Sequence, residues 1–326
     1  MQRPAVLLLG LLLGCGDDAA PPDAPASSAW SQGPTMPRRR LEPGVAVLGT
    51  NLVVIGGFDT TVVEGLHITD AIDVLDTTTD TWSTPLPPAP VAWSHIDLAS
   101  VGGRLFLLGG LEGTNFVARG DAFVLDAGAT AWRSIAPLPA GMERGAAGVV
   151  ATPSHVYLLG GASTTAALAS CLDYDIANDS WSELPPLPMP RSHPAAMGLA
   201  DGTLIVAAGL ATIDASMPLA DVWALSPGAS AWQPRAGMLG KARGGCPYAV
   251  LGGELVCAAG EAGTSAQRAV DAYDPAADTW RSLETMPVNR AGTQGAVIGD
   301  RFYVPGGAAA LVFTPLDTLW IFTAPG

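Results

Sequence analysis

The sequence predicts an all-β fold, a six-bladed β-propeller, and two repeated marks carry that prediction. The first mark is an apolar segment that ends in glycine and starts again every 47 to 53 residues. It occupies residues 51–57, 104–110, 155–161, 203–209, 254–260 and 301–307. The second mark is a tryptophan in step with the first: Trp30, Trp82, Trp132, Trp181, Trp232 and Trp280. A fixed period of this length is typical of repeat architectures.

One repeat reads as four antiparallel strands. In the fifth repeat, residues 246–251 form a short apolar segment and Gly252-Gly253 a hairpin turn. The second, third and fourth strands follow at 254–260, 270–274 and 279–287. Six such four-stranded units can hide their strand edges by closing into a ring of blades.

The two ends of the chain indicate how the ring closes. The last repeat stops after a third-strand segment at 317–322 and has no fourth strand of its own. The missing segment lies at the other end, because AWSQGPTMP at 29–37 matches the fourth-strand segments at 131–139 and 180–188. We therefore expect the N-terminal strand to complete the last blade.

These marks resemble the Kelch repeat, and the resemblance covers almost all of the chain beyond residue 28. A Gly-Gly doublet follows the second strand in most repeats. The third strand contains an aspartate in most repeats, and a tryptophan stands six residues after it. That aspartate follows a leucine or tyrosine: Leu75-Asp76, Leu125-Asp126, Tyr174-Asp175 and Tyr273-Asp274. Repeats four and five depart at Ala208-Gly209, Ser226 and Ala259-Gly260. The resemblance implies a Kelch-type β-propeller with the first strand of each blade innermost.

The N-terminus reads as an export signal. The apolar run from Ala5 to Leu13 is far shorter than the roughly 20 residues that a membrane-spanning helix needs. Leu12-Leu13-Gly14-Cys15 resembles the lipobox of a bacterial lipoprotein, whose cysteine is lipidated. An ordinary secretory signal is the alternative.

This reading divides the chain into three parts. Residues 1–14 are the signal peptide, residues 15–28 hold the lipidated Cys15 and a flexible tether rich in Pro, Ala and Asp, and residues 29–326 form the propeller. We expect a monomer that is exported and lipid-anchored in the bacterial cell envelope, in the periplasm or at the cell surface. Apart from this anchor, no contact with the membrane is expected.

The charge of the chain restricts its partners. The formal net charge is -14, so the surface should repel polyanions, and nucleic acid is not expected as a partner. The least repetitive segments are the loops between the second and third strands, which share one face of the ring. Variable loops on a rigid scaffold are the expected place for binding.

One set of residues recurs at that face. The position eleven or twelve residues before the second strand holds five arginines and one tryptophan: Arg40, Trp93, Arg144, Arg191, Arg243 and Arg290. If they line the mouth of the central channel, they form a cationic pocket for a carboxylate, a sulfate or an acidic sugar. The alternative is a structural role, in which the arginines cap backbone carbonyls of the neighbouring blade.

Cysteine and histidine give no firm site. Cys246 and Cys257 lie on one predicted hairpin and leave two readings open, a disulfide or two buried thiols, while Cys171 lies two repeats away. The histidines are scattered over four repeats: His67, His95, His155 and His193. His95 and His193 share a face but have a blade between them, so we expect no metal site and no cofactor.

No catalytic residue is predicted. The P-loop, the Rossmann glycine fingerprint, HExxH and GxSxG are all absent. Kelch propellers include galactose oxidase, whose copper site needs Tyr and His ligands, but Tyr174 and Tyr273 occupy a structural repeat position here. We expect a binding or protein-interaction module for a protein or glycan, anionic ligands included. The alternative is a carbohydrate-active enzyme resembling sialic acid mutarotase, favoured if Glu64, Glu112 or Glu261 points into the channel mouth.

Overall fold

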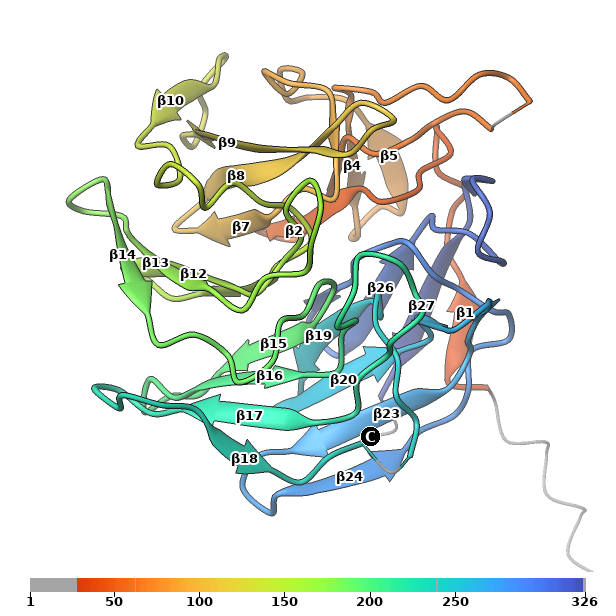
Figure 1. The fold of residues 1–326 in the computed structure, drawn as a ribbon. Helices are drawn as coiled ribbons and strands as arrows, with labels where there is room; N and C mark the ends of the chain where they lie inside the picture. The colour runs from red at the N-terminus through yellow and green to blue at the C-terminus, as the bar shows by residue number, and fades with distance from the viewer. Residues whose placement is uncertain (1–27, 62, 239, 325–326) are drawn as a thin grey trace, which may run out of the picture.

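The computed structural model describes residues 28–324 except residues 62 and 239, and within these ranges it contains strands and no helix. The strands form six large sheets arranged around a central axis and one small two-stranded sheet (Figure 1). The signal, Cys15 and most of the predicted tether lie outside the described residues. Among those that are described, nothing has the helical length and apolarity that crossing a membrane requires.

Each sheet is one blade, numbered here in chain order. Blade 1 consists of β2 (Gly44–Leu48), β3 (Asn51–Ile55), β4 (Ile72–Asp76) and β5 (Thr81–Ser83). Blade 2 consists of β6 (Trp93–Ser94), β7 (Leu98–Val101), β8 (Arg104–Glu112), β9 (Val117–Leu125) and β10 (Arg133–Ile135). Blade 3 consists of β11 (Gly148–Ala151), β12 (His155–Leu159), β13 (Cys171–Asp175) and β14 (Ser180–Leu184).

The second half of the ring repeats this plan. Blade 4 consists of β15 (Ala195–Gly198), β16 (Leu204–Ala207), β17 (Val222–Leu225) and β18 (Gln233–Arg235). Blade 5 consists of β19 (Tyr248–Leu251), β20 (Glu254–Ala258), β23 (Val270–Asp274) and β24 (Thr279–Ser282), with a small hairpin of β21 (Glu261–Ala262) and β22 (Ser265–Ala266). Blade 6 consists of β25 (Ala296–Ile298), β26 (Arg301–Pro305), β27 (Leu319–Thr323) and β1 (Trp30–Gln32).

The predicted closure of the ring is confirmed. Strand β1 pairs antiparallel with β27, the last strand of the chain, and Trp30 stands opposite Phe322. The two rings lie 5.2 Å apart, and the Trp30 indole donates a hydrogen bond of 2.9 Å to the Glu284 carbonyl in blade 5. The N-terminal strand therefore covers the outer edge of blade 6 and ties it to blade 5.

The repeated tryptophans join consecutive blades. Five further indoles donate to a backbone carbonyl of the preceding blade, as Trp30 does: Trp82 to Pro34, Trp132 to Pro87, Trp181 to Ala136, Trp232 to Pro185 and Trp280 to Ala236. Each such bond satisfies a polar group while the ring packs against apolar neighbours. This geometry gives the tryptophan repeat a structural explanation.

The described cysteines are free and buried. The strand register sets Tyr248, and not Cys246, opposite Cys257. The Cys246 thiol instead donates to the Ala259 carbonyl at 3.5 Å. Of the two readings that the sequence leaves open, the structure has the pair of buried thiols.

Candidate functional site

Six equivalent residues, one from each blade, surround the propeller axis. This axial ring consists of Glu42, His95, Ala146, His193, Gly245 and Gly292, each two residues beyond a position of the predicted arginine set. Backbone N–H groups link ring neighbours: Glu42 to the Gly292 carbonyl, His95 to Glu42, Ala146 to His95, His193 to Ala146 and Gly245 to His193, at 2.7 to 3.1 Å. The blades thus meet in a narrow circle of hydrogen bonds.

All members of the axial ring have left-handed backbone, with φ between 51° and 67°. That conformation costs a residue other than glycine about 1–2 kcal/mol, so the fold favours glycine here, as at Gly245 and Gly292. Glu42, His95 and His193 carry polar side chains against this preference. Strain retained at a few positions is typical of functional sites.

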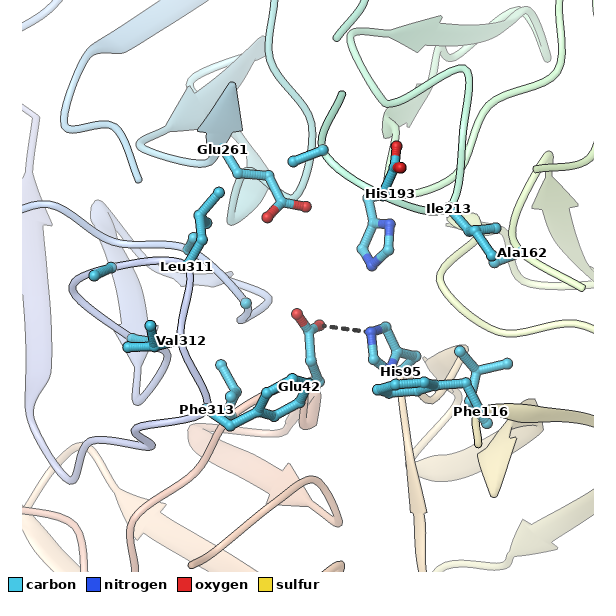
Figure 2. A pocket seen from close by; sticks show the side chains of 18 of the residues that line it. Glu42, His95, Phe116, Ala162, His193, Ile213, Glu261, Leu311, Val312 and Phe313 are labelled. Carbon is cyan, nitrogen blue, oxygen red and sulfur yellow. Dashed lines mark ion pairs between the residues drawn. The ribbon is translucent and has the colours of Figure 1, made fainter. Parts of the chain in front are cut away.

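A cavity of about 690 Å³ opens above the axial ring. Glu42, His95, His193 and Glu261 point into it, and apolar side chains including Phe116 and Phe313 form its walls (Figure 2). Its lining comes largely from the loops between the second and third strands, at 111–116, 162–164, 213–215, 261–264 and 308–313. These loops are the ones that the sequence predicts to carry the binding site.

Two serines fix the orientation of the histidines. Ser94 Oγ donates to the Leu111 carbonyl at 3.4 Å, and Ser192 Oγ donates to the Thr212 carbonyl at 3.0 Å. A hydroxyl has one proton to give, and each serine oxygen also lies within hydrogen-bond distance of the neighbouring histidine Nδ1, at 2.9 and 3.1 Å. When the serine gives its proton to the carbonyl, the imidazole is protonated on Nδ1 and the Nε2 lone pair is left for the cavity; when the serine donates to Nδ1, the proton is on Nε2.

Burial sets the charges in the cavity. It lowers the pKa of His95 to about 3 and that of His193 to about 4, so both imidazoles are neutral near pH 7. Burial, together with the nearby Glu42, raises the pKa of Glu261 to about 8, and burial also raises the pKa of Glu42. Desolvation opposes the charged form of every one of these groups.

The two glycines of the axial ring leave room for the carboxyl groups. A Cβ atom at Gly292 would stand 2.8 Å from Glu42 Oε1, and one at Gly245 would stand 3.4 Å from Glu261 Oε1. Since a Cβ at Gly292 would also meet the Leu41 side chain at 2.4 Å, a larger residue there would force Glu42 out of its position. The small ring residues thus support the polar ones.

The predicted arginine ring does not line the cavity. Its five arginines are at most 2% exposed, and their guanidinium groups point into their own blades. Arg144 donates to the carbonyls of Gly160 and Ser170 at 2.8 and 2.7 Å, and Arg191 binds Asp221 at 2.7 Å. These arginines cap carbonyls, as the alternative proposes, but of their own blade and not of the neighbouring one.

The other residues of the predicted arginine set also point into their own blades. Arg40 and Arg243 pair with Asp73 and Asp271 in the third strands of their blades, and Arg290 donates to the Gly306 carbonyl at 2.8 Å. Trp93 is buried, with its ring 6.5 Å from that of Phe123. The left-handed residue two positions later turns the backbone, and it is that residue which reaches the axis.

The expectation that His95 and His193 are held apart is wrong. Their rings lie 5.2 Å from one another in an edge-to-face arrangement. Blade 3 does separate their blades, but on the axis it contributes only Ala146, whose methyl group leaves the two imidazoles in contact. His67 and His155 instead pair with Asp59 and Asp173 away from this cluster.

Of the three glutamates singled out in the sequence, one reaches the cavity. Glu261 does, whereas Glu64 pairs with Arg39 and Glu112 with Arg119 on the surface. Glu42 is the residue that the sequence reasoning missed. Counting two residues beyond the arginine position in every repeat, and not only at the histidines, would have found it.

One ligand atom from each of Glu42, His95 and His193 lies within 4.8 Å of the others. The Nε2 atom of His95 stands 3.6 Å from Glu42 Oε2, the contact drawn in Figure 2. Among the described residues, this is the cluster that could hold a metal ion.

Comparison with known proteins agrees with the geometry. The model of the KLHDC2/KLHL20/DRC7 Kelch-repeats domain matches residues 94–307, and the Kelch motif matches residues 39–85. Kelch-like protein terF of Aspergillus terreus is 28% identical over 97% of this chain and 72% of its own length. Human Kelch-like protein 25 is 26% identical over 77% of this chain, which spans 42% of that relative.

Among solved structures, that of YjhT superimposes with a TM-score of 0.72 at 14% sequence identity. The alignment covers 88% of this chain and 95% of YjhT. At this level of identity the similarity establishes a common fold.

Proposed function

This chain belongs to the Kelch-repeat family of β-propellers, and from that premise we propose that it binds a small uncharged or cationic organic molecule in the axial cavity. Kelch propellers are binding or protein-interaction modules. A fold of this kind carries its function in the site built on it, and here the cavity provides that site.

The observation that carries the proposal is the composition of the cavity. Its volume of about 690 Å³ falls within the roughly 300–1,000 Å³ of small-molecule sites. Polar groups gather at its floor, while apolar side chains, among them the half-exposed Ile213 and Val312, form its rim. This division suits a ligand with a polar end and an apolar body.

The lining of the cavity selects the ligand. Glu42, Asp214 and Glu261 contribute carboxyl groups to it, and no lysine or arginine occurs among the described lining residues. Burial raises the pKa of Glu42 and Glu261, so these groups suit a neutral polar ligand when protonated and a cationic one when ionised. With the arginines buried in the blades, the reason for expecting an anionic ligand falls away. A neutral or cationic group that donates hydrogen bonds to Glu42 and to the Nε2 lone pairs fits better.

We place this module outside the cytoplasm, held by lipid on Cys15. The support is the sequence of the first 15 residues, with the lipobox-like Leu12-Leu13-Gly14-Cys15. A tether of polar and small residues would let the propeller present its cavity to solvent at a membrane surface.

A binding screen tests the proposed function. The full-length chain is titrated by calorimetry with neutral and cationic metabolites and, for comparison, acidic sugars. For any ligand found, Ile213→Lys with Val312→Lys should weaken binding at least tenfold, because both side chains lie at the rim. Val63→Lys is the matched control, since Val63 is 98% exposed and does not line the cavity. A ligand set made up of acidic sugars, or affinities that the rim variant leaves unchanged, would contradict the proposal.

A second candidate is a carbohydrate-active enzyme, the alternative raised by the sequence. The observation in its favour is that Glu261 points into the cavity together with the imidazoles of His95 and His193 (Figure 2). A carboxyl group and an acceptor nitrogen across one cavity are what proton transfer to and from a sugar needs. NMR exchange between the anomers of neutral and acidic sugars tests it: turnover that Glu261→Gln abolishes supports an enzyme, and exchange at the uncatalysed rate excludes it.

A further inference from the structure

We propose that Glu42, His95 and His193 form a binding site for one divalent transition-metal ion of the zinc type, at the floor of the cavity on the propeller axis. The inference does not rest on the proposed function: the ion would take the Glu42 carboxylate and the two Nε2 atoms itself, and an organic ligand would then meet the ion's free position instead of these atoms. The ligand set, the orientation of the imidazoles and the open side of the site support this assignment.

The ligand set is that of a zinc site with a free position. Two histidines and one glutamate are the protein ligands of several such centres, and imidazole ligands favour Zn²⁺ and its neighbours over Mg²⁺ or Ca²⁺. Bonds of 2.0–2.2 Å in a tetrahedron place ligand atoms about 3.4 Å apart. Here they lie within 4.8 Å of one another, and His95 Nε2 stands 3.6 Å from Glu42 Oε2, so modest shifts of these side chains would close the site.

Each imidazole has a hydrogen-bond partner at Nδ1, as a metal ligand requires. With Ser94 and Ser192 accepting the Nδ1–H protons at 2.9 and 3.1 Å, the Nε2 lone pairs would be available to the ion. Metal-binding histidines commonly have such a partner for the second ring nitrogen, which fixes the ring. Buried serines in blades 2 and 4 occupy equivalent positions, and the hydroxyl of each also lies within hydrogen-bond distance of a backbone carbonyl.

The remaining positions of the axial ring leave the site open. Ala146, Gly245 and Gly292 have no polar side chain to offer the ion, so its outer side would face the cavity, with Glu261 across the space (Figure 2). Two neutral imidazoles and one ionised carboxylate carry a single negative charge, so the site with a divalent cation would have a net charge of +1 that a bound hydroxide or an anionic donor atom could offset. The free position would take water or a donor atom of a ligand.

Metal analysis tests the site. The full-length chain is stripped with EDTA, dialysed against buffered Zn²⁺ and assayed for zinc per chain. The wild type should retain one equivalent, and His95→Asn with His193→Asn should weaken binding at least a hundredfold. Asparagine is chosen because it tolerates left-handed backbone and is a poor ligand. His67→Asn with His155→Asn, which removes the two other histidines, should bind as the wild type does.

Co²⁺ spectra of the wild-type chain test the site without relying on a variant that must fold. Co²⁺ added to the stripped wild type should give intense visible bands of a low-symmetry site, which Glu42→Gln reduces. Thermal unfolding in EDTA checks that the variants fold. Retention of less than 0.1 zinc per chain by the wild type, or equal retention by the His95/His193 variant, would overturn the proposal. Neither readout uses an organic ligand, so the metal site and the proposed function can fail separately.

Discussion

Replacing Arg144 by glutamine should destabilise the propeller strongly without touching the cavity. The side chain is fully buried, and its Nη1 atom donates to Gly160 O at 2.8 Å and to Ser170 O at 2.7 Å. A second nitrogen, Nη2, donates to Ser170 Oγ at 2.8 Å. Glutamine is too short to restore these contacts.

The magnitude follows from the carbonyls left behind. A buried acceptor that loses its partner costs about 1–3 kcal/mol, which for the carbonyls of Gly160 and Ser170 gives about 2–6 kcal/mol. The Met142 carbonyl, which accepts from Arg144 Nε at 2.9 Å, is left out of this sum because that contact is only partly buried. Because Ser170 O keeps the Gly160 N–H at 3.2 Å, we expect the lower half of that range, about 2–4 kcal/mol. Because the total free energy of unfolding of a domain is about 5–15 kcal/mol, a decrease of this size should be easily measured.

Urea unfolding followed by tryptophan fluorescence measures the effect. The matched control is Arg133→Gln, because Arg133 is exposed and pairs with Asp126 at the surface. An exposed pair contributes about 0–1 kcal/mol, so the control should stay near the wild type. If the Arg144 variant unfolds within about 0.5 kcal/mol of the control, the arginines are not structural caps and the reasoning fails.

Three further predictions concern the anchor, the closure and pH. Cys15→Ser should move the chain from the membrane fraction to the soluble fraction, and membrane association that persists would contradict the lipoprotein signal. Deleting 29–37 should lower the melting temperature far more than deleting 16–28, because only the first deletion uncovers the edge of β27; equal melting temperatures would refute the closure. Burial raises the pKa of Glu261 to about 8, so the folded state holds this proton to higher pH than the unfolded state. The free energy of unfolding should therefore fall between about pH 4.5 and 8, and Glu261→Gln should reduce that fall; an unchanged slope would count against the burial of this carboxyl group.

The sequence predicts the architecture because its repeated residues each make the same contact within or between neighbouring blades. Each tryptophan bonds the preceding blade, and the matching segment at 29–37 identifies the strand that closes the ring. Such contacts repeat once per blade, so their periodicity is visible in one dimension. The same periodicity marks where each variable loop begins, and these loops largely line the cavity.

The periodicity of the sequence does not predict which side chains form the floor of the cavity. The side chains of Arg40 and Glu42 are only two residues apart, yet one enters the blade and the other reaches the axis. Strand alternation would place them on one side, but the left-handed conformation at Glu42 breaks that alternation. The distance between His95 and His193 was also misjudged, because counting blades says nothing of how narrow the ring is at the axis.

The tautomers of His95 and His193 test the central claim most directly, because the proposed ligand and metal sites both need Nε2 lone pairs that face the cavity. Long-range ¹H–¹⁵N NMR spectra of the metal-free chain at pH 7 report the protonation of each ring nitrogen, and the His95→Asn and His193→Asn variants assign the signals. The account predicts that both imidazoles are neutral, with the proton on Nδ1 and none on Nε2. A proton on Nε2 of either ring, or two protonated nitrogens, would contradict it.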